Sequence, residues 1–205
     1  MRTTRLAPLA LFLALLASPA AAGEGKPADG AQPSAEAMAK MQAWQASFAP
    51  GAEHARLAEH FKGRWNATTT MWMDPSAPPS TSSGTATNTV EFGGRQVRTH
   101  YKGEFMGEPF EGIAMTGYDN AAREYVNHWV DSMGTGQYFT TGSYDPSTRT
   151  YTFRGEMADP SEGGKRYATR DTIRIVDADH HVMESFETRG GTERRMMRIE
   201  YARAD

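Results

Sequence analysis

The feature that most constrains the fold is a short phrase that the chain uses twice. YDNAAREY at 118–125 is followed by YDPSTRTY at 144–151, so Tyr-Asp, Arg and Tyr recur at one spacing. An aspartate favours the start of a tight turn because its carboxylate accepts hydrogen bonds from backbone N–H groups just ahead. The flanking tyrosines suit half-buried strands. The copies are about two strands and their turns apart, which predicts that the chain turns twice at the same end of an antiparallel sheet.

The rest of the chain after residue 65 continues this pattern of strands. Runs rich in Val, Thr, Tyr, Phe and Trp are separated by Gly, Asn, Asp and Pro, and no long helical pattern interrupts them. Ten strands joined by hairpins leave two exposed edges unless the sheet closes on itself. We therefore predict an all-β fold, a single antiparallel up-and-down β-barrel with a short N-terminal helical extension. The predicted strands are 65–73, 84–92, 95–104, 109–118, 124–131, 136–144, 149–157, 166–176, 180–187 and 192–202.

Three parts are predicted along the chain. Residues 1–22 are typical of a signal peptide, with Arg2 and Arg5 before an apolar run and three small residues at the end, so we expect export to a periplasm or the exterior. Residues 23–50 are expected to form a flexible linker and an amphipathic helix that starts after Ser34. Residues 51–205 form the barrel domain and begin with a second short helix over about 53–62. Apolar residues recur on one stripe of the first helix, a pattern for packing or for a partner: Met38, Met41, Trp44 and Phe48.

Charge and composition exclude several classes of function. The net charge is −3, and it becomes −5 without Arg2 and Arg5, because residues 1–22 contain no acid. A mildly acidic chain has no electrostatic basis for binding nucleic acid or an anionic membrane, and no membrane insertion is expected of the mature chain. The absence of cysteine excludes disulfides, thiolate metal sites and a cysteine nucleophile. The sequence does not indicate an oligomeric state.

Strand alternation sorts the connections between two ends of the predicted barrel. One end has short turns, whereas the other has longer, glycine-rich loops that carry Met73, Met106 and Met133, with Met157 beside them. Methionine adapts to irregular apolar partners. These residues are predicted to surround the entrance for a small apolar ligand, and the alternative is that they fill a loosely packed barrel end.

Two resemblances support a lipocalin-like barrel. Gly63-x-Trp65 is similar to the opening motif of lipocalins and their calycin relatives, in which the Trp closes the barrel and a basic residue of the last strand packs over it. Arg198 and Arg203 are the candidates here, and Arg198 is preferred. The chain also resembles the domain-of-unknown-function family 1579 over most of residues 51–160. This resemblance implies the barrel but carries no activity or catalytic residue. Its motifs are MWMDPSAPP (71–79), GGR (93–95), YKGEFMGEPFEGI (101–113), TGYDN (116–120), YVNHWVDSMGTG (125–136) and GSYD (142–145).

Common catalytic and metal-binding motifs are absent. The chain has no G-x-S-x-G, P-loop or H-E-x-x-H sequence, so it gives no sign of the common hydrolase, nucleotide or zinc-protease chemistries. Its six histidines do not fall at a metal-binding spacing, and no metal or cofactor is predicted. Related ten-stranded barrels can hold haem through one histidine, but nothing in the sequence identifies such a residue.

The predicted strand 124–131 carries the best candidate site. Tyr125, Asn127, Trp129 and Asp131 share one face, and Val126, His128 and Val130 share the other. If the first face points inward, it supplies aromatic walls, an amide and a carboxylate near the mouth. If the second points inward, His128 lies inside between two valines.

The sequence therefore predicts a barrel that binds a small apolar or amphipathic molecule, with Tyr125, Asn127, Trp129, Asp131, Met73, Met106 and Met133 as ligand-binding residues. One alternative is an enzyme that uses the same cavity, with Asp131, His128 and Tyr125 as the first residues to test. Another is a structural or partner-binding envelope protein whose barrel is filled by its own side chains.

Overall fold

The computed structural model describes residues 33–74 and 76–204. The predicted signal peptide and most of the predicted linker lie outside the described residues. Two helices precede the sheet, α1 (Ala35–Ala46) and α2 (Ala52–Phe61). The side chain of Ser34 accepts a hydrogen bond from the Ala37 N–H and caps α1 as predicted.

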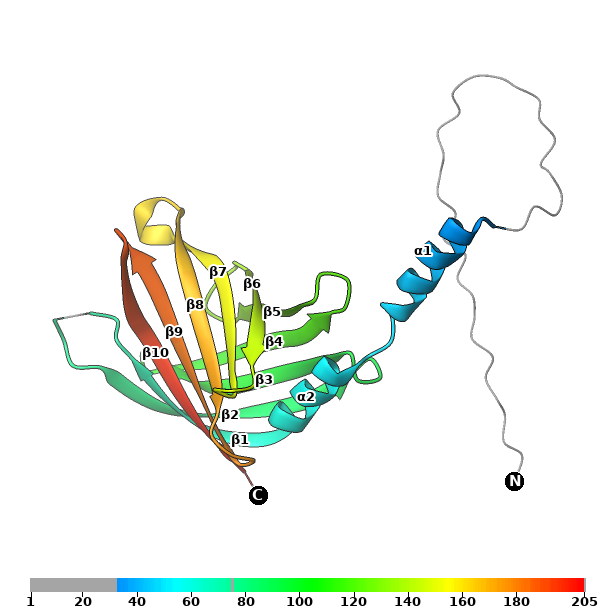
Figure 1. Ribbon diagram of the computed structural model, residues 1–205. Helices are drawn as coiled ribbons and strands as arrows, with labels where there is room; N and C mark the ends of the chain where they lie inside the picture. The colour runs from blue at the N-terminus through cyan, green and yellow to red at the C-terminus, as the bar shows by residue number, and fades with distance from the viewer. Residues whose placement is uncertain (1–32, 75, 205) are drawn as a thin grey trace.

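Ten antiparallel strands form a closed barrel, which confirms the predicted fold class (Figure 1). Each strand pairs with its neighbours in the sequence, and the first pairs with the last, from Trp65 opposite Arg203 to Met71 opposite Met197. Closure leaves no free sheet edge. The strands are β1 (Gly63–Met71), β2 (Ser80–Glu91), β3 (Gln96–Phe105), β4 (Glu108–Asp119), β5 (Glu124–Asp131), β6 (Tyr138–Asp145), β7 (Thr150–Asp159), β8 (Lys165–Ile175), β9 (His180–Arg189) and β10 (Thr192–Arg203). A short 3-10 helix, η1 (Pro160–Glu162), lies between β7 and β8.

The repeated phrase forms two equivalent turns at the same end of the barrel. Tyr118 lies opposite Tyr125 across the first turn, and Tyr144 lies opposite Tyr151 across the second. The carboxylate of Asp119 accepts hydrogen bonds from the Ala121 and Ala122 N–H groups, and Asp145 acts in the same way on Ser147. Each copy thus sets a turn and a cross-strand pair of tyrosines.

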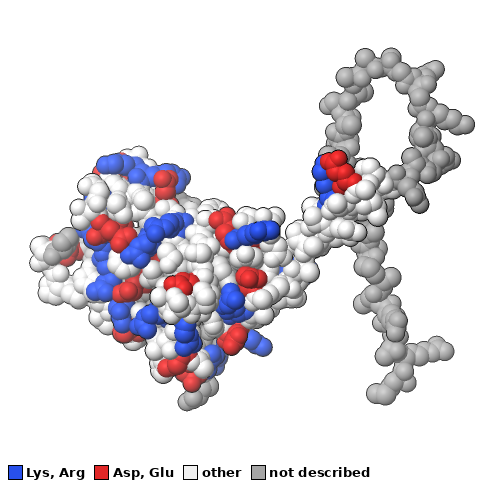
Figure 2. Space-filling model, in the orientation of Figure 1, with Lys and Arg blue, Asp and Glu red and all other residues white. Residues whose placement is uncertain are grey.

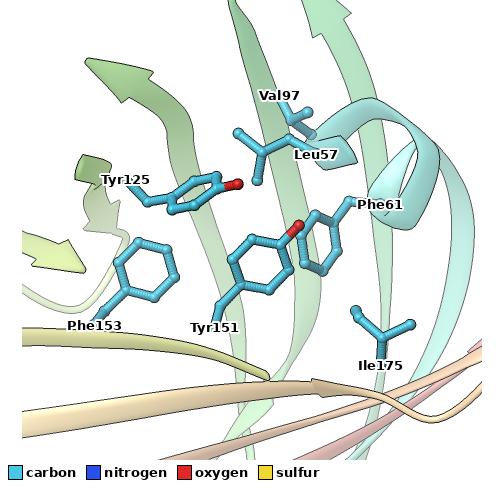
Figure 3. Close-up of a cluster of buried hydrophobic side chains, with 7 residues drawn as sticks. All are labelled: Leu57, Phe61, Val97, Tyr125, Tyr151, Phe153 and Ile175. Carbon is cyan, nitrogen blue, oxygen red and sulfur yellow. The ribbon is translucent and has the colours of Figure 1, made fainter. Parts of the chain in front are cut away.

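Helix α2 closes this end of the barrel. Its Leu57 and Phe61 pack among buried side chains of the barrel strands (Figure 3). Arg56 Nη1 donates to the Tyr125 hydroxyl over 2.8 Å, so a polar group of the helix satisfies one of the buried phenols. The strand residues of this cluster are Val97, Tyr125, Tyr151, Phe153 and Ile175.

Trp65 lies beside Phe61 in the closed end and is 1% exposed. Its indole N–H donates to the Phe61 carbonyl over 2.8 Å. The guanidinium of Arg203 lies 4.2 Å from the centroid of the Trp65 ring. The prediction that Arg198 is the basic residue packed over Trp65 was therefore wrong. Arg198 lies on the outer face of β10, where it pairs with Glu184 and Glu200.

Helix α1 has no buried residue, and its apolar stripe, Met38, Met41 and Trp44, is exposed. Figure 2 shows this helix as a largely uncharged surface, whereas acidic and basic side chains are interspersed over the barrel. Neither helix of the described part is long and apolar enough to cross a membrane.

Candidate functional site

The barrel encloses a cavity of about 460 Å³. This volume is within the range of small-molecule sites. Phe61 lies at its closed end, and the walls are mainly apolar, with Phe110, Trp129, Phe153 and Ile199 among them. The cavity is therefore a space inside the barrel that the side chains of the chain leave unfilled.

Trp129 on β5 lines this cavity because a glycine on the neighbouring strand makes room for it. A Cβ atom at Gly112 on β4 would lie 2.1 Å from the indole ring, which is closer than any real contact. The ring of Phe110 stacks against the same indole, with 6.3 Å between the ring centroids. Sequence alternation placed Trp129 on its face correctly, but the role of Gly112 requires the register of β4 and β5.

The structure places the face of β5 that carries Trp129 on the inside. Asn127 and Asp131 line the cavity with it. Tyr125, on the same face, lies in the closed-end core and does not line the cavity. His128 lies on the outside, where its ring stacks on the exposed Phe139 with 4.3 Å between centroids. The alternative with His128 inside is therefore excluded.

Asp131 has a structural role at the mouth. One carboxylate oxygen accepts from the Trp129 indole N–H over 2.9 Å. The other accepts from the backbone N–H groups of Met133 and Gly134, over 2.9 and 3.1 Å. This side chain thus holds both the indole and the turn after β5 in place.

Methionines do surround the cavity, but the set differs from the predicted one. Met133 lines it, whereas Met73 and Met106 do not, although Met133 and Met73 are both 54% exposed. Met106 lies in the hairpin turn between β3 and β4, just past the lining residues Glu104 and Phe105. The other lining methionines are Met71, Met157, Met183 and Met197. Strand alternation was the signal that could have found Met71 and Met183.

A polar group on β6 and β8 was missed by the sequence reasoning. The Tyr138 hydroxyl donates to Asp171 over 2.9 Å and lies 2.6 Å from the Thr169 hydroxyl. Asp171 is only 5% exposed. Burial raises the pKa of its carboxyl, an effect that the Ser185 and Tyr138 hydroxyls and Arg170 oppose. A charged residue on the inner face of β8, between Thr169 and Ile173, was the available signal.

Two further polar residues lie near the closed end of the cavity. Asn88 Nδ2 donates to the Phe61 carbonyl over 2.7 Å. His181 stacks on Tyr201 and packs edge-on against Trp65, with 4.4 Å between centroids in both pairs. Burial lowers the pKa of His181 to about 3, so its imidazole is neutral near pH 7. Within residues 33–74 and 76–204, no three His, Asp or Glu side chains gather closely enough to hold a metal ion.

Three comparisons place the chain among known proteins. A family model described as "Protein of unknown function (DUF1579)" matches residues 49–203. The comparison with curated proteins found no match. The fold is similar to that in the crystal structure of Rv2717c from M. tuberculosis, with a TM-score of 0.55 and 12% identity over 76% of this chain and 100% of that chain. At this identity the likeness shows the fold alone.

Proposed function

The chain belongs to the DUF1579 family of proteins of unknown function, and from this premise we propose that it binds a small apolar or amphipathic molecule inside the barrel. The observation that carries the proposal is the enclosed, mainly apolar cavity of about 460 Å³. Protein interiors are normally packed to the density of organic crystals. A barrel filled by its own side chains would leave no such space, so the cavity disfavours a purely structural role.

The lining supports an amphipathic ligand in particular. Trp129, Phe110 and five methionines offer a broad and adaptable apolar surface. Asn127 contributes its amide, although its oxygen already accepts from the Thr116 hydroxyl over 2.8 Å. One apolar body with one polar group matches this distribution.

The direct test of binding in the cavity is a substitution on β4 that places a larger side chain in it. The full chain is titrated with a neutral, environment-sensitive dye, and its fluorescence is followed for the wild type and for Ala114→Phe. Ala114 lines the cavity, so the larger side chain should weaken dye binding by about tenfold or more. The matched control is Ile113→Phe on the outward face of the same strand, which should bind the dye as the wild type does. Equal binding by all three proteins contradicts the proposal.

The entrance is tested by a pair of methionine variants. Met133→Gln should weaken dye binding because Met133 lines the cavity. Met106→Gln should leave it unchanged because Met106 is exposed on the hairpin turn after β3. If Met106→Gln weakened dye binding more than Met133→Gln, the entrance would lie beside Met106 and not beside Met133. Native mass spectrometry of protein purified from its source then identifies a retained ligand by its mass.

Catalysis in the same cavity is the second candidate, and it rests on the mutually hydrogen-bonded pair Tyr138 and Asp171. Burial raises the pKa of both groups, which keeps the Tyr138 phenol protonated at neutral pH and makes the Asp171 carboxylate a stronger base than an exposed one. Asp171 is therefore the residue on which a catalytic role would depend. An enzyme would lose turnover in Asp171→Asn while it still binds the dye.

We also propose that the chain is exported. The support is the sequence of residues 1–22 alone, with its basic start, apolar run and small residues at the end. Expression of the full chain in a bacterial host, followed by mass measurement of the periplasmic fraction, should give a protein that starts at Gly23. Recovery of only the uncleaved chain from the cytoplasm contradicts export.

A further inference from the structure

Four buried polar atoms without a hydrogen-bond partner belong to residues of the cavity lining. They are Asn88 Oδ1, Thr140 Oγ1, Asp171 Oδ1 and His181 Nδ1. One further atom of this kind in the described part of the chain, Arg194 Nε, lies outside the lining. Buried polar atoms in folded proteins almost always have a partner, so this concentration requires an explanation. An occupant that brings its own hydrogen bonds to the cavity supplies one.

The hydrogen bonds around Asp171 run toward its carboxylate. Tyr138 has a single hydroxyl proton and donates it to Asp171 Oδ2, so the Tyr138 oxygen accepts from Thr169. Gly155 on β7 lies in register between Thr140 and Thr169, and a Cβ atom there would lie 2.7 Å from the Thr140 methyl group. The chain of donors ends at the carboxylate. The Ser185 hydroxyl, opposite Asp171 on β9, lies near enough to lower the pKa of this carboxyl, but it makes no hydrogen bond to the second oxygen, which has no partner. A donor on the occupant therefore competes only with Ser185 for this oxygen.

Asn88, at the closed end of the cavity, also has an acceptor without a hydrogen-bond donor. Its Nδ2 is engaged by the Phe61 carbonyl, which leaves the oxygen as the free atom. An amide oxygen only accepts hydrogen bonds. Asp171 and Asn88 thus each have an acceptor oxygen that a hydrogen-bond donor on the occupant would satisfy.

The charges of the lining act in the same direction. The acids are Glu104, Asp131 and Asp171, and among the described residues that line the cavity none is Lys or Arg. Asp131 is already bonded to the indole and to the mouth turn. A carboxylate ligand would lose its hydration without gaining a cation, whereas an ammonium group would gain the buried carboxylate of Asp171.

Resting on the proposed function, we propose that the preferred ligand is an amphipathic amine, whose nitrogen binds Asp171 and whose apolar body lies against Trp129 and Phe110, and that the cavity rejects carboxylates. The nitrogen donates to Asp171 Oδ1. If Asp171 carries a proton, a neutral amine takes that proton, and the same ion pair results. The raised pKa of Asp171 makes it costly to leave this carboxylate unpaired, which increases the gain from a cation.

The test uses three probes with the same apolar chain: n-decylamine, n-decanol and n-decanoate. Each competes with the neutral dye for the full chain, at concentrations below micelle formation. The expected order of affinity is amine, then alcohol, then carboxylate, with about tenfold or more between the first and the last. Decanoate that binds as tightly as decylamine overturns the inference, and it does so on the wild type alone.

Asp171→Asn separates the contribution of the ligand's head group from that of the apolar cavity walls. The amide keeps the size of the side chain and an acceptor for Tyr138, so dye and decanol binding should change by less than about threefold. The preference for decylamine over decanol should fall by about tenfold, because the amide carries no charge. The matched control is Glu200→Gln, an exposed acid on the outward face of β10 that does not line the cavity, which should keep the preference. Unchanged preference in Asp171→Asn overturns the inference.

The two proposals fail in different ways. If the dye and all three probes do not bind, as checked by calorimetry, the proposed function fails and takes the inference with it. If the dye binds and the three probes displace it equally well, the cavity binds apolar molecules but does not select amines. If Asp171→Asn lowers the melting temperature too far for binding to be measured, Tyr138→Phe is the second variant. It keeps the Asp171 carboxylate and removes the hydrogen bond to Asp171 Oδ2, so the preference for the amine should persist.

Discussion

Arg203 holds the closed end of the barrel together through several partners. Its guanidinium covers the ring of Trp65, Nη1 donates to the Lys62 carbonyl after α2, and Nε donates to Asp179 in the turn after β8. These contacts join the helix, the first strand and a late turn. Arg198, on the same strand, makes only ion pairs on the outer face.

Arg203→Ala should therefore destabilise the fold, and Arg198→Ala should not. We expect a loss of about 2 kcal/mol for Arg203→Ala, because it removes a cation–π contact and charged hydrogen bonds. Arg198→Ala is expected to cost less than about 1 kcal/mol, as exposed ion pairs do. Urea unfolding of both variants measures the difference. Equal losses would show that the contact with Trp65 contributes little.

His181 makes the stability of the barrel sensitive to acid. Its folded pKa is about 3, well below the ordinary value, because it is buried. Between the two values the unfolded chain binds a proton and the folded chain does not, so stability falls as the pH falls. Replacement by Phe keeps a ring against Tyr201 and removes the titration. Relative to His181→Phe, the wild type should lose about 2 kcal/mol between about pH 7 and about pH 5. A difference that does not change with pH would contradict this prediction.

At the scale of elements, the two helices contribute unequally to the barrel. α1 buries no residue, whereas α2 inserts Leu57 and Phe61 into the closed-end core. The link between them is anchored by Asn120, whose side chain donates to the carbonyls of Ser47 and Ala49. The barrel therefore needs the chain from about residue 47 onward.

A chain that starts at residue 47 should unfold within about 0.5 kcal/mol of the full chain, because α1 makes no buried contact. Leu57→Ala in the full chain should cost about 2–5 kcal/mol, because Leu57 is 1% exposed and its loss leaves a cavity. Chemical denaturation measures both. A strongly destabilised short chain would mean that α1 supports the barrel by a route other than burial.

The elements themselves could be predicted from the sequence because strand alternation and turn residues are local signals. The repeated Tyr-Asp phrase indicated two turns at one end, and the structure contains them. The inward residues of β10 could not be counted in the same way. A bulge between Arg195 and Met197 shifts the register, so the residues after it point to the opposite side from the one that regular alternation predicts. Alternation counted from Thr192 would therefore place Arg198 on the inner face. In the structure it is Arg203 that reaches the ring of Trp65.

The candidate site could be predicted only where a single strand defines it. Trp129 and Asn127 follow from the alternation of β5, and they line the cavity. The pairing of Tyr138 with Asp171 joins β6 to β8 across β7, so it depends on two registers that no local pattern reveals. Whether these residues bind a ligand stays a prediction.

At the scale of the whole molecule, closure of the barrel and its inner cavity couple binding to folding. The chain has no disulfide, so its stability depends on burial within the barrel. The cavity exists only when all ten strands are paired. A ligand in this cavity therefore binds the folded state and not the unfolded chain, and it must raise the stability by mass action.

Decanol is the appropriate ligand for this last prediction, because a neutral head group makes the result independent of the preference for amines. At about a hundredfold excess over its dissociation constant, it should stabilise the wild type by about 2.7 kcal/mol. For a domain of this size the melting temperature should rise by about 5–10 °C. Ala114→Phe should show a much smaller rise, because its cavity is filled, and Ile113→Phe should behave as the wild type. Differential scanning calorimetry on protein that has been unfolded, stripped of bound molecules and refolded measures the shift. An equal rise in Ala114→Phe would mean that decanol acts on the outer surface and that the cavity does not couple ligand to fold.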